Sequence, residues 1–176
     1  MTRFGAASAP GLQEQVAMAL MNKGVTLGQL ERNEEAVQVY EEVVTRFGTA
    51  SAPGLQEPVT AAMNGIGFEM LRRAKKNWAT GDEVLARETL LKAQEHIASA
   101  DKRQPENPYI LGNLAYLAFL LDNQARSREL LIQAIKIGGE EIRQVELDDA
   151  EIFKLPKDEE FQALVRSIQI PDSKNV

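Results

Sequence analysis

Cysteine is absent from this sequence, which excludes a disulfide framework, thiolate catalysis and a thiolate metal site. There is one histidine, His96, and no second histidine or cysteine with which to complete a zinc site. Long hydrophobic runs are missing too, because the longest, around residues 109–121, is short and is interrupted by Gly112 and Asn113. We therefore expect no metal, no cofactor and no membrane association, and the sequence predicts a cytoplasmic protein.

Basic residues are fewer than acidic ones, with 20 Lys and Arg against 26 Asp and Glu. The formal net charge is −6, and residues 139–176 alone contain ten acidic and five basic residues. Binding to nucleic acid depends on Lys and Arg side chains that displace counterions from phosphates, and no basic stripe is present. We therefore expect no nucleic-acid partner. Hydrophobic residues make up 44% of the chain, which is enough for a folded core.

The sequence contains no motif that is typical of an active site. Paired carboxylates would need the fold to bring two acidic pairs together. The pairs are Glu34–Glu35, Glu41–Glu42, Asp148–Asp149 and Glu159–Glu160. Helix dipoles and solvation explain such residues at helix starts and on solvent faces. A glycine-rich phosphate loop is absent. No catalytic residue is assigned, and an enzyme is the least favoured class.

A basic cluster near Trp78 has two interpretations. Its members are Arg72, Arg73, Lys75 and Lys76. Such a cluster could receive an acidic partner, or it could be a solvated helix face near the tip of a hairpin. The solvated face is the simpler interpretation and the one that we favour.

What the sequence does contain is a repeat. Residues 2–16 and 45–59 are identical at thirteen of fifteen positions. A fixed offset of this size is typical of stacked repeat proteins. Because residues 45–48 are expected to end a helix, residues 2–5 should end a helix whose body is missing. We therefore interpret residues 1–12 as the remnant of an upstream repeat and its loop.

Hydrophobic periodicity predicts helices in each repeat. One helix is expected from about Gln13 to Leu30 and a second from Glu34 to Arg46, with Asn33 as N-cap and Gly48 as terminator. Sustained period-two alternation is absent, so strands are not expected. In the second repeat, the spacing predicts two elongated helices over residues 57–79 and 82–102, with Gly81 in the turn.

The order of small and large residues resembles the tetratricopeptide repeat, in which small residues lie where two helices cross and large ones fill the hollow beside the crossing. The first repeat supplies Leu20, Lys23, Gly24, Leu27, Ala36 and Tyr40. The third supplies Leu111, Leu114, Ala115, Ala118, Ser127, Leu131 and Ala134. The resemblance covers residues 13–138. It implies an all-α fold, an α–α superhelix or solenoid of antiparallel helix hairpins.

The expected organisation is built from these repeats. Repeat one spans residues 13–48, repeat two spans 57–105 with its elongated hairpin, and repeat three spans 108–139. Residues 140–176 are expected to form an acidic helical cap and tail. A helix beginning at Asp158 would place four apolar residues on one stripe, namely Phe161, Leu164, Val165 and Ile168.

The resemblance implies a protein-interaction or scaffold module that binds a peptide or partner protein in a groove formed by the first helix of each repeat. By motif position, the groove residues would be Met18, Met21, Val25, Asn64, Phe68, Leu71, Arg72, Tyr109, Tyr116, Phe119 and Leu120. This lining is mainly apolar, so the expected partner carries an apolar segment. The chain's own tail, with Phe153, Leu155 and Phe161, is an alternative occupant.

Self-assembly is the alternative function. Phe4, Val16, Met18 and Leu20 lie where an upstream hairpin would stack, and a two-fold dimer lets one patch cover its own copy. The sequence therefore also predicts a homodimer through the N-terminal hairpin.

Overall fold

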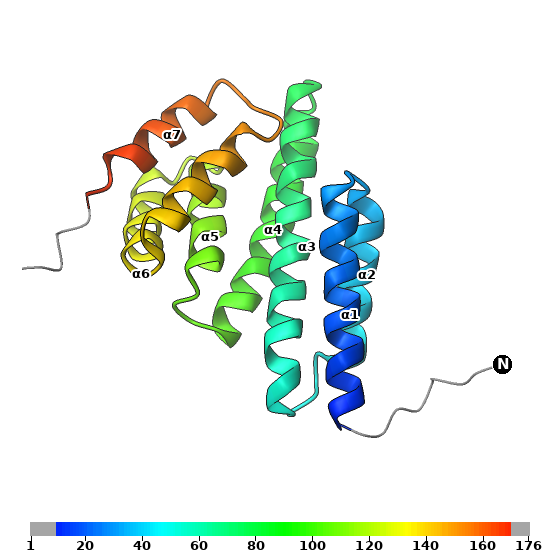
Figure 1. The fold of residues 1–176 in the computed structure, drawn as a ribbon. Helices are drawn as coiled ribbons and strands as arrows, with labels where there is room; N and C mark the ends of the chain where they lie inside the picture. Colours follow the sequence, from blue (N-terminus) through cyan, green and yellow to red (C-terminus); the bar gives the residue numbers. More distant parts are fainter. Residues whose placement is uncertain (1–9, 170–176) are drawn as a thin grey trace, which may run out of the picture. The chain divides into compact units, whose positions relative to one another are not determined.

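The computed structural model describes residues 10–169, and within this range the chain forms seven helices and no strand (Figure 1). The helices are α1 (Pro10–Gln29), α2 (Asn33–Phe47), α3 (Pro53–Ala79), α4 (Glu83–Arg103), α5 (Pro108–Leu120), α6 (Gln124–Glu151) and α7 (Asp158–Ser167). The expected all-α fold of helix hairpins is confirmed. The expected remnant at residues 1–12 lies mostly outside the described residues, as does Phe4.

The chain divides into two compact units, and the division falls inside α3, between Glu69 and Met70. The first unit contains α1, α2 and the first part of α3. The second contains the end of α3 and the four later helices. Among the described residues, no helix is both long and apolar enough to cross a lipid bilayer.

The first unit is organised around the ring of Tyr40 on α2. Gly24 on α1 and Gly65 on α3 both face this ring, and a Cβ atom added to them would lie 2.3 Å and 2.8 Å from it. Only glycine therefore allows both helices to pack this closely against the aromatic ring. Burial, together with the charge of Glu69, raises the pKa of the Tyr40 hydroxyl to about 12.

Two helices begin earlier than the periodicity indicates. Helices α1 and α3 start at Pro10 and Pro53, because proline is favoured at the first helical position, where its missing N–H is not needed. The expected Asn33 cap is wrong, since Asn33 is the first residue of α2 and Arg32 precedes it without a side-chain capping bond. Arg32 instead pairs with Glu35 at 2.6 Å.

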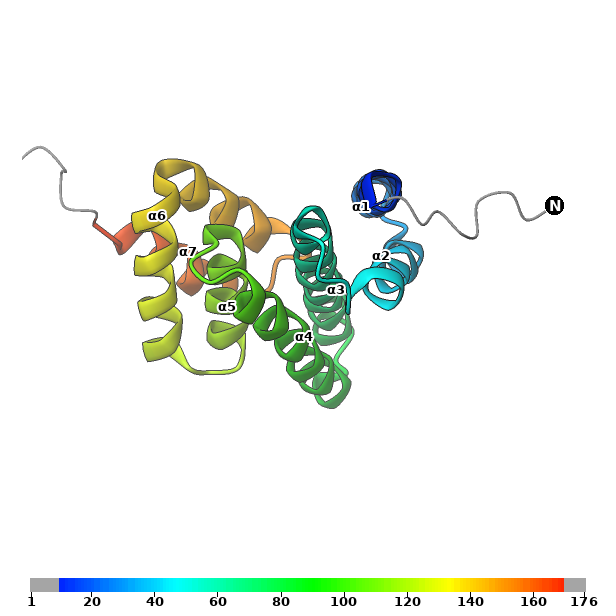
Figure 2. The ribbon, with the colours of Figure 1, turned by 90° about the horizontal axis from the view of Figure 1, so that it is seen from below.

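The second unit begins with the tip of the α3–α4 hairpin. Gly81 lies in this turn with φ of +87°, as the spacing predicts, and glycine adopts this conformation without strain. Asp82 caps α4 by accepting a hydrogen bond from the Leu85 N–H at 3.0 Å. After α4, the chain forms α5 and α6, which lie side by side (Figure 2).

Helix α6 is bent at Gly139, whose φ of 66° and ψ of −148° are not helical. The bend falls at the expected boundary between repeat three, which ends at residue 139, and the C-terminal cap, which begins at residue 140. It allows the second half of α6 to pair with α7, which comes after a short connection. Helix α7 buries Phe161, Val165 and the adjoining Ile168, which are three of the four residues on its expected apolar stripe.

Candidate functional site

In the first unit, the predicted groove residues on α1 are accessible. Met18 and Val25 are 57% and 46% exposed, and Met21 is half-buried. Residues at i, i+3 and i+7 share one face of a helix, so these three side chains form a continuous apolar strip. We call this strip the α1 face. On α3, Asn64 and Phe68 are half-buried.

In the second unit, most of the predicted groove residues are not surface. Leu71 and Arg72 on α3 are buried, as are Tyr116, Phe119 and Leu120 on α5. Tyr109 alone among the predicted α5 residues is accessible, and its hydroxyl donates a hydrogen bond to Glu141 at 2.5 Å. The predicted residues on α1 and at positions 64 and 68 of α3 are therefore exposed or half-buried, whereas those of the second unit are buried apart from Tyr109.

The tail residue Phe161 covers two aromatic residues of α5, Tyr116 and Phe119. Its ring stacks on Tyr116 with a centroid separation of 4.4 Å and packs against Phe119 at 5.2 Å. The two other candidate tail residues differ, because Leu155 is buried whereas Phe153 is partly exposed and lies near the Arg72 guanidinium. The C-terminal segment, which the sequence offers as an alternative occupant of the groove, therefore covers Tyr116 and Phe119.

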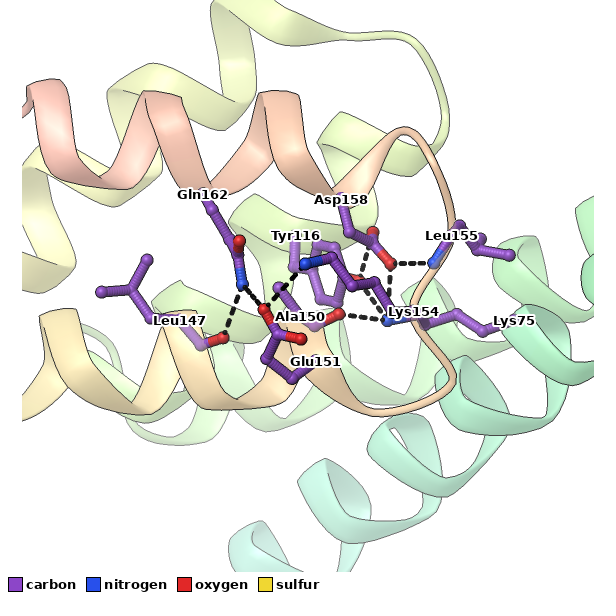
Figure 3. A network of polar contacts seen from close by, with 9 residues as sticks. All are labelled: Lys75, Tyr116, Leu147, Ala150, Glu151, Lys154, Leu155, Asp158 and Gln162. Atoms are coloured by element: carbon purple, nitrogen blue, oxygen red, sulfur yellow. Dashed lines mark hydrogen bonds and ion pairs between the residues drawn. The ribbon is translucent and has the colours of Figure 1, made fainter.

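A buried polar network lies at the beginning of α7 (Figure 3). The Lys75 ammonium group donates to the Tyr116 hydroxyl at 2.6 Å and to the Ala150 carbonyl at 3.0 Å, and it forms an ion pair with Asp158 at 2.9 Å. Asp158 also accepts hydrogen bonds from the Tyr116 hydroxyl and from the Leu155 N–H. Both side chains of the ion pair are fully buried.

Burial dominates the ionisation of this network. Desolvation lowers the pKa of Lys75, although the hydrogen bond and the charge of Asp158 oppose this shift. Desolvation and the charge of Asp158 raise the pKa of the Tyr116 hydroxyl, which stays protonated and can donate its hydrogen bond. The network is therefore the Lys75–Asp158 ion pair with the protonated Tyr116 hydroxyl bonded to both of its members.

Two further carboxyls lie on the same part of α6. Desolvation raises the pKa of Glu146 well above its usual value, and the charge of Asp149 adds to this shift. Desolvation also raises the pKa of Asp149 to about 6, with Lys75 and Arg72 opposing and Asp148 reinforcing the shift. Gly112 leaves space for the Glu146 carboxyl, because a Cβ atom there would lie 1.9 Å from its Oε1.

Stability should therefore fall as pH rises through the range in which Asp149 ionises. The pKa of Asp149 in the folded chain lies above the unfolded value of 3.8, so folding favours the protonated carboxyl. The stability that this preference contributes is fully present below pH 3.8 and is lost as pH rises through about 6. We expect Asp149→Asn to be more stable than the unchanged chain at pH 7, by up to about 3 kcal/mol, and equally stable at pH 4. Urea unfolding at the two pH values, followed by Trp78 fluorescence, measures this difference.

Asp148→Asn is the matched control, because Asp148 is the exposed neighbour of Asp149. It should leave most of the pH dependence in place. If the urea midpoint changed equally between pH 4 and pH 7 in Asp149→Asn and in the unchanged chain, the raised pKa of the half-buried Asp149 would be contradicted.

The other end of α7 is held by Arg143 of α6. Its guanidinium donates to the Val165 carbonyl at 2.6 Å and to the Ile168 carbonyl at 2.8 Å. A cation at these carbonyls also complements the negative end of the helix dipole. Between the two ends, Gln162 donates to the Leu147 carbonyl at 3.2 Å and to Glu151 at 2.5 Å.

Sequence reasoning missed this network. The basic cluster was expected to be a solvated face, and that expectation is wrong for Lys75 and Arg72, which are buried, whereas Arg73 and Lys76 are exposed. Helical spacing contained part of the signal, because Lys75 lies four residues after Leu71 on the buried face of α3. His96 is half-buried on α4, and no group of metal-ligating side chains occurs in the described part of the chain.

Two comparisons with known proteins gave a match, one to part of the sequence and one to the fold. A family model described as tetratricopeptide repeat matches residues 16–48. Among solved structures, the C-terminal TPR-containing domain of an FK506-binding protein from Plasmodium falciparum matches with a TM-score of 0.53 and 16% identity, over 81% of this chain and 91% of that one. Curated protein sequences gave no match.

The fold is thus the all-α helical-hairpin fold of a tetratricopeptide repeat domain. Within this fold, residues 16–48 are the segment that matches the tetratricopeptide repeat family model, and the solved structure shares the fold over most of the chain. Domains of this family are typically protein-interaction modules rather than enzymes.

Proposed function

We propose that this chain is a protein-interaction module whose α1 face binds an apolar segment of a partner protein or peptide. The observation that carries the proposal is the exposure of Met18 and Val25 on the first helix of the matched repeat. The resemblance to the repeat motif implies that these positions face a ligand groove. Contiguous apolar side chains of this kind are stabilised when a partner removes them from water.

The chemistry of the α1 face indicates the kind of ligand. Methionine side chains are flexible and polarisable, so Met18 and Met21 can adapt to apolar side chains of different shapes. The flanking Asn22 is polar and exposed, and it can hydrogen-bond a ligand backbone. We therefore expect an apolar helical or extended segment as ligand, with few charges at its contact positions.

The proposal uses only part of the predicted groove. Asn64 and Phe68 on α3 belong to the same unit as the α1 face and remain candidate contacts because they are partly accessible. Tyr109 belongs to the second unit and is not assigned to the α1 face. Leu71, Arg72, Tyr116, Phe119 and Leu120 are buried, and partner binding at these five residues is not part of the proposal.

A double variant tests the α1 face. Peptides are first selected from a random library for binding to the purified chain. Met18→Glu with Val25→Glu should then weaken their binding at least tenfold, because burying Met and Val side chains contributes about 1.5–3 kcal/mol each and tenfold corresponds to about 1.4 kcal/mol. Fluorescence anisotropy measures the affinity, and circular dichroism checks that helicity is unchanged.

Val84→Glu on α4 is the matched control, because Val84 is 72% exposed but lies outside the α1 face. Its peptide affinity should equal that of the unchanged chain. Equal binding by the double variant would place the ligand elsewhere and contradict the proposal. The homodimer is the second candidate, since a second copy can cover the same residues; sedimentation would then give a dimer that the double variant dissociates.

A further inference from the structure

We propose that α7 occupies a receptor surface of the second unit, that it can be displaced, and that this surface accepts a partner helix with an acidic residue one turn before an aromatic residue. We call this the α7 seat, and its residues are Lys75, Tyr116, Phe119 and Arg143. The α7 seat and the α1 face share no residue, so the two proposals can fail independently.

The first element of recognition is a carboxylate. All three N–H groups of the Lys75 ammonium have a partner, and Asp158 of α7 is the only charged one. Without α7, the ammonium group would retain the Tyr116 hydroxyl and the Ala150 carbonyl as hydrogen-bond partners, and the charges of Asp149 and Glu151 on α6 would act on it without an ion pair. Because a buried cation is strongly destabilised when its directly bonded anion is removed, the seat selects for a ligand that brings an anion to this point.

The second element is an aromatic ring. Phe161 lies three residues after Asp158, so both side chains are on one face of α7. Its ring lies on Tyr116 and Phe119, and it is fully buried. Tyr116 therefore contacts both ligand groups, with its hydroxyl on Asp158 and its ring on Phe161. This shared contact fixes the spacing between the acid and the aromatic.

The third element is the helix end. Arg143 donates to the backbone carbonyls of Val165 and Ile168, which any helix of this length supplies whatever its sequence. The α7 seat therefore recognises a carboxylate at the start of the ligand helix, an aromatic side chain one turn later and free backbone carbonyls at its end. These contacts are those of a helix bound as a ligand in a complementary surface.

The structure also favours displacement. Helix α7 has ten residues, and its outer residues Glu159, Glu160, Ala163 and Arg166 are exposed. It comes after the short connection at residues 152–157, so it can leave without breaking the α5–α6 pair. A buried ion pair adds specificity and little net stability compared with apolar residues of the same size. A helix held in this way is better suited to exchange than one held by an all-apolar core.

A peptide of residues 152–169 carrying a fluorescent label serves as the probe. The full chain with Phe161→Ala should bind this peptide at least tenfold more tightly than the unchanged chain, because its own α7 competes less well. A peptide with Asp158→Asn should bind at least tenfold more weakly than the natural peptide. Ala163→Ser in the chain, on the exposed side of α7, should leave peptide affinity unchanged.

Two results of the peptide experiment would overturn the proposal. One is equal peptide affinity for the Phe161→Ala chain and the unchanged chain when both are helical by circular dichroism. The other is binding that is indifferent to Asp158→Asn in the peptide, which would mean that the Lys75 site does not read the ligand.

Hydrogen exchange on the unchanged chain tests displacement without any variant. Backbone amides of α7 should exchange at least tenfold faster than the buried amides of α5, because α7 opens alone. Equal exchange rates in α7 and α5 would show that α7 opens only when the whole unit unfolds, and the proposal would be wrong even if the Phe161→Ala chain failed to fold.

Discussion

Replacing Lys75 by methionine should lower the free energy of unfolding of the second unit by about 3–5 kcal/mol. Methionine is similar in length to lysine but has no charge, so Asp158 would remain buried without its cation. The Ala150 carbonyl would also lose its donor. Urea unfolding followed by the fluorescence of Trp78, the only tryptophan, measures this loss.

Lys76→Met is the matched control, because Lys76 is the adjacent residue and is exposed. Surface substitutions of this kind usually change stability by less than about 0.5 kcal/mol. A second control removes both charges, with Lys75→Met and Asp158→Asn in one chain. It should be more stable than Lys75→Met alone, since no unpaired charge is then buried and the single asparagine oxygen can still accept the hydrogen bond from the Leu155 N–H. An effect of Lys75→Met as small as that of Lys76→Met would disprove the buried pair.

Phe119→Ala should also destabilise the second unit by about 3–5 kcal/mol, as expected for truncation of a buried phenylalanine. Phe119 is 2% exposed and packs against Phe161, so its removal leaves a cavity below α7. The motif position alone predicts something different, namely weaker partner binding with unchanged stability. The same urea experiment separates these two outcomes.

Tyr109→Ala provides the comparison on the same helix. Tyr109 is 43% exposed and contacts Glu141 at the surface, so its truncation should cost less than about 1 kcal/mol. If Phe119→Ala were no more destabilising than Tyr109→Ala, Phe119 would belong to an accessible groove instead of the core.

These two predictions concern side chains that the motif places in a binding groove or on a solvated face. In the first unit, the motif position and the observed exposure agree, because Met18 and Val25 are accessible. In the second unit they disagree, because the chain's own C-terminal helix covers Tyr116 and Phe119. The difference arises from α7, which lies C-terminal to the repeats, and the repeat pattern itself contains no information about that helix.

Much of the fold could be predicted from local sequence features. The periodic apolar residues of α2 and α7, and Gly81 in the α3–α4 turn, all act over a few residues, where propensity and side-chain spacing decide the backbone. Periodicity places the starts of α1 and α3 too late, because Pro10 and Pro53 precede the first periodic apolar residues and resemble loop residues. Proline has two opposite meanings near a helix, and its position relative to the first turn decides between them.

The sequence by itself thus determined an all-α chain of helix hairpins, the positions of most helices and the repeat to which residues 16–48 belong. It did not determine which charged residues are buried. Arg73, Lys75 and Lys76 are chemically similar and close in the chain, yet only Lys75 meets Tyr116, the Ala150 carbonyl and Asp158. Those partners come from three distant segments, and a charge is tolerated in the interior only where such partners converge. That convergence is a property of the tertiary structure, because it depends on the bend at Gly139 and on the return of α7 over α5.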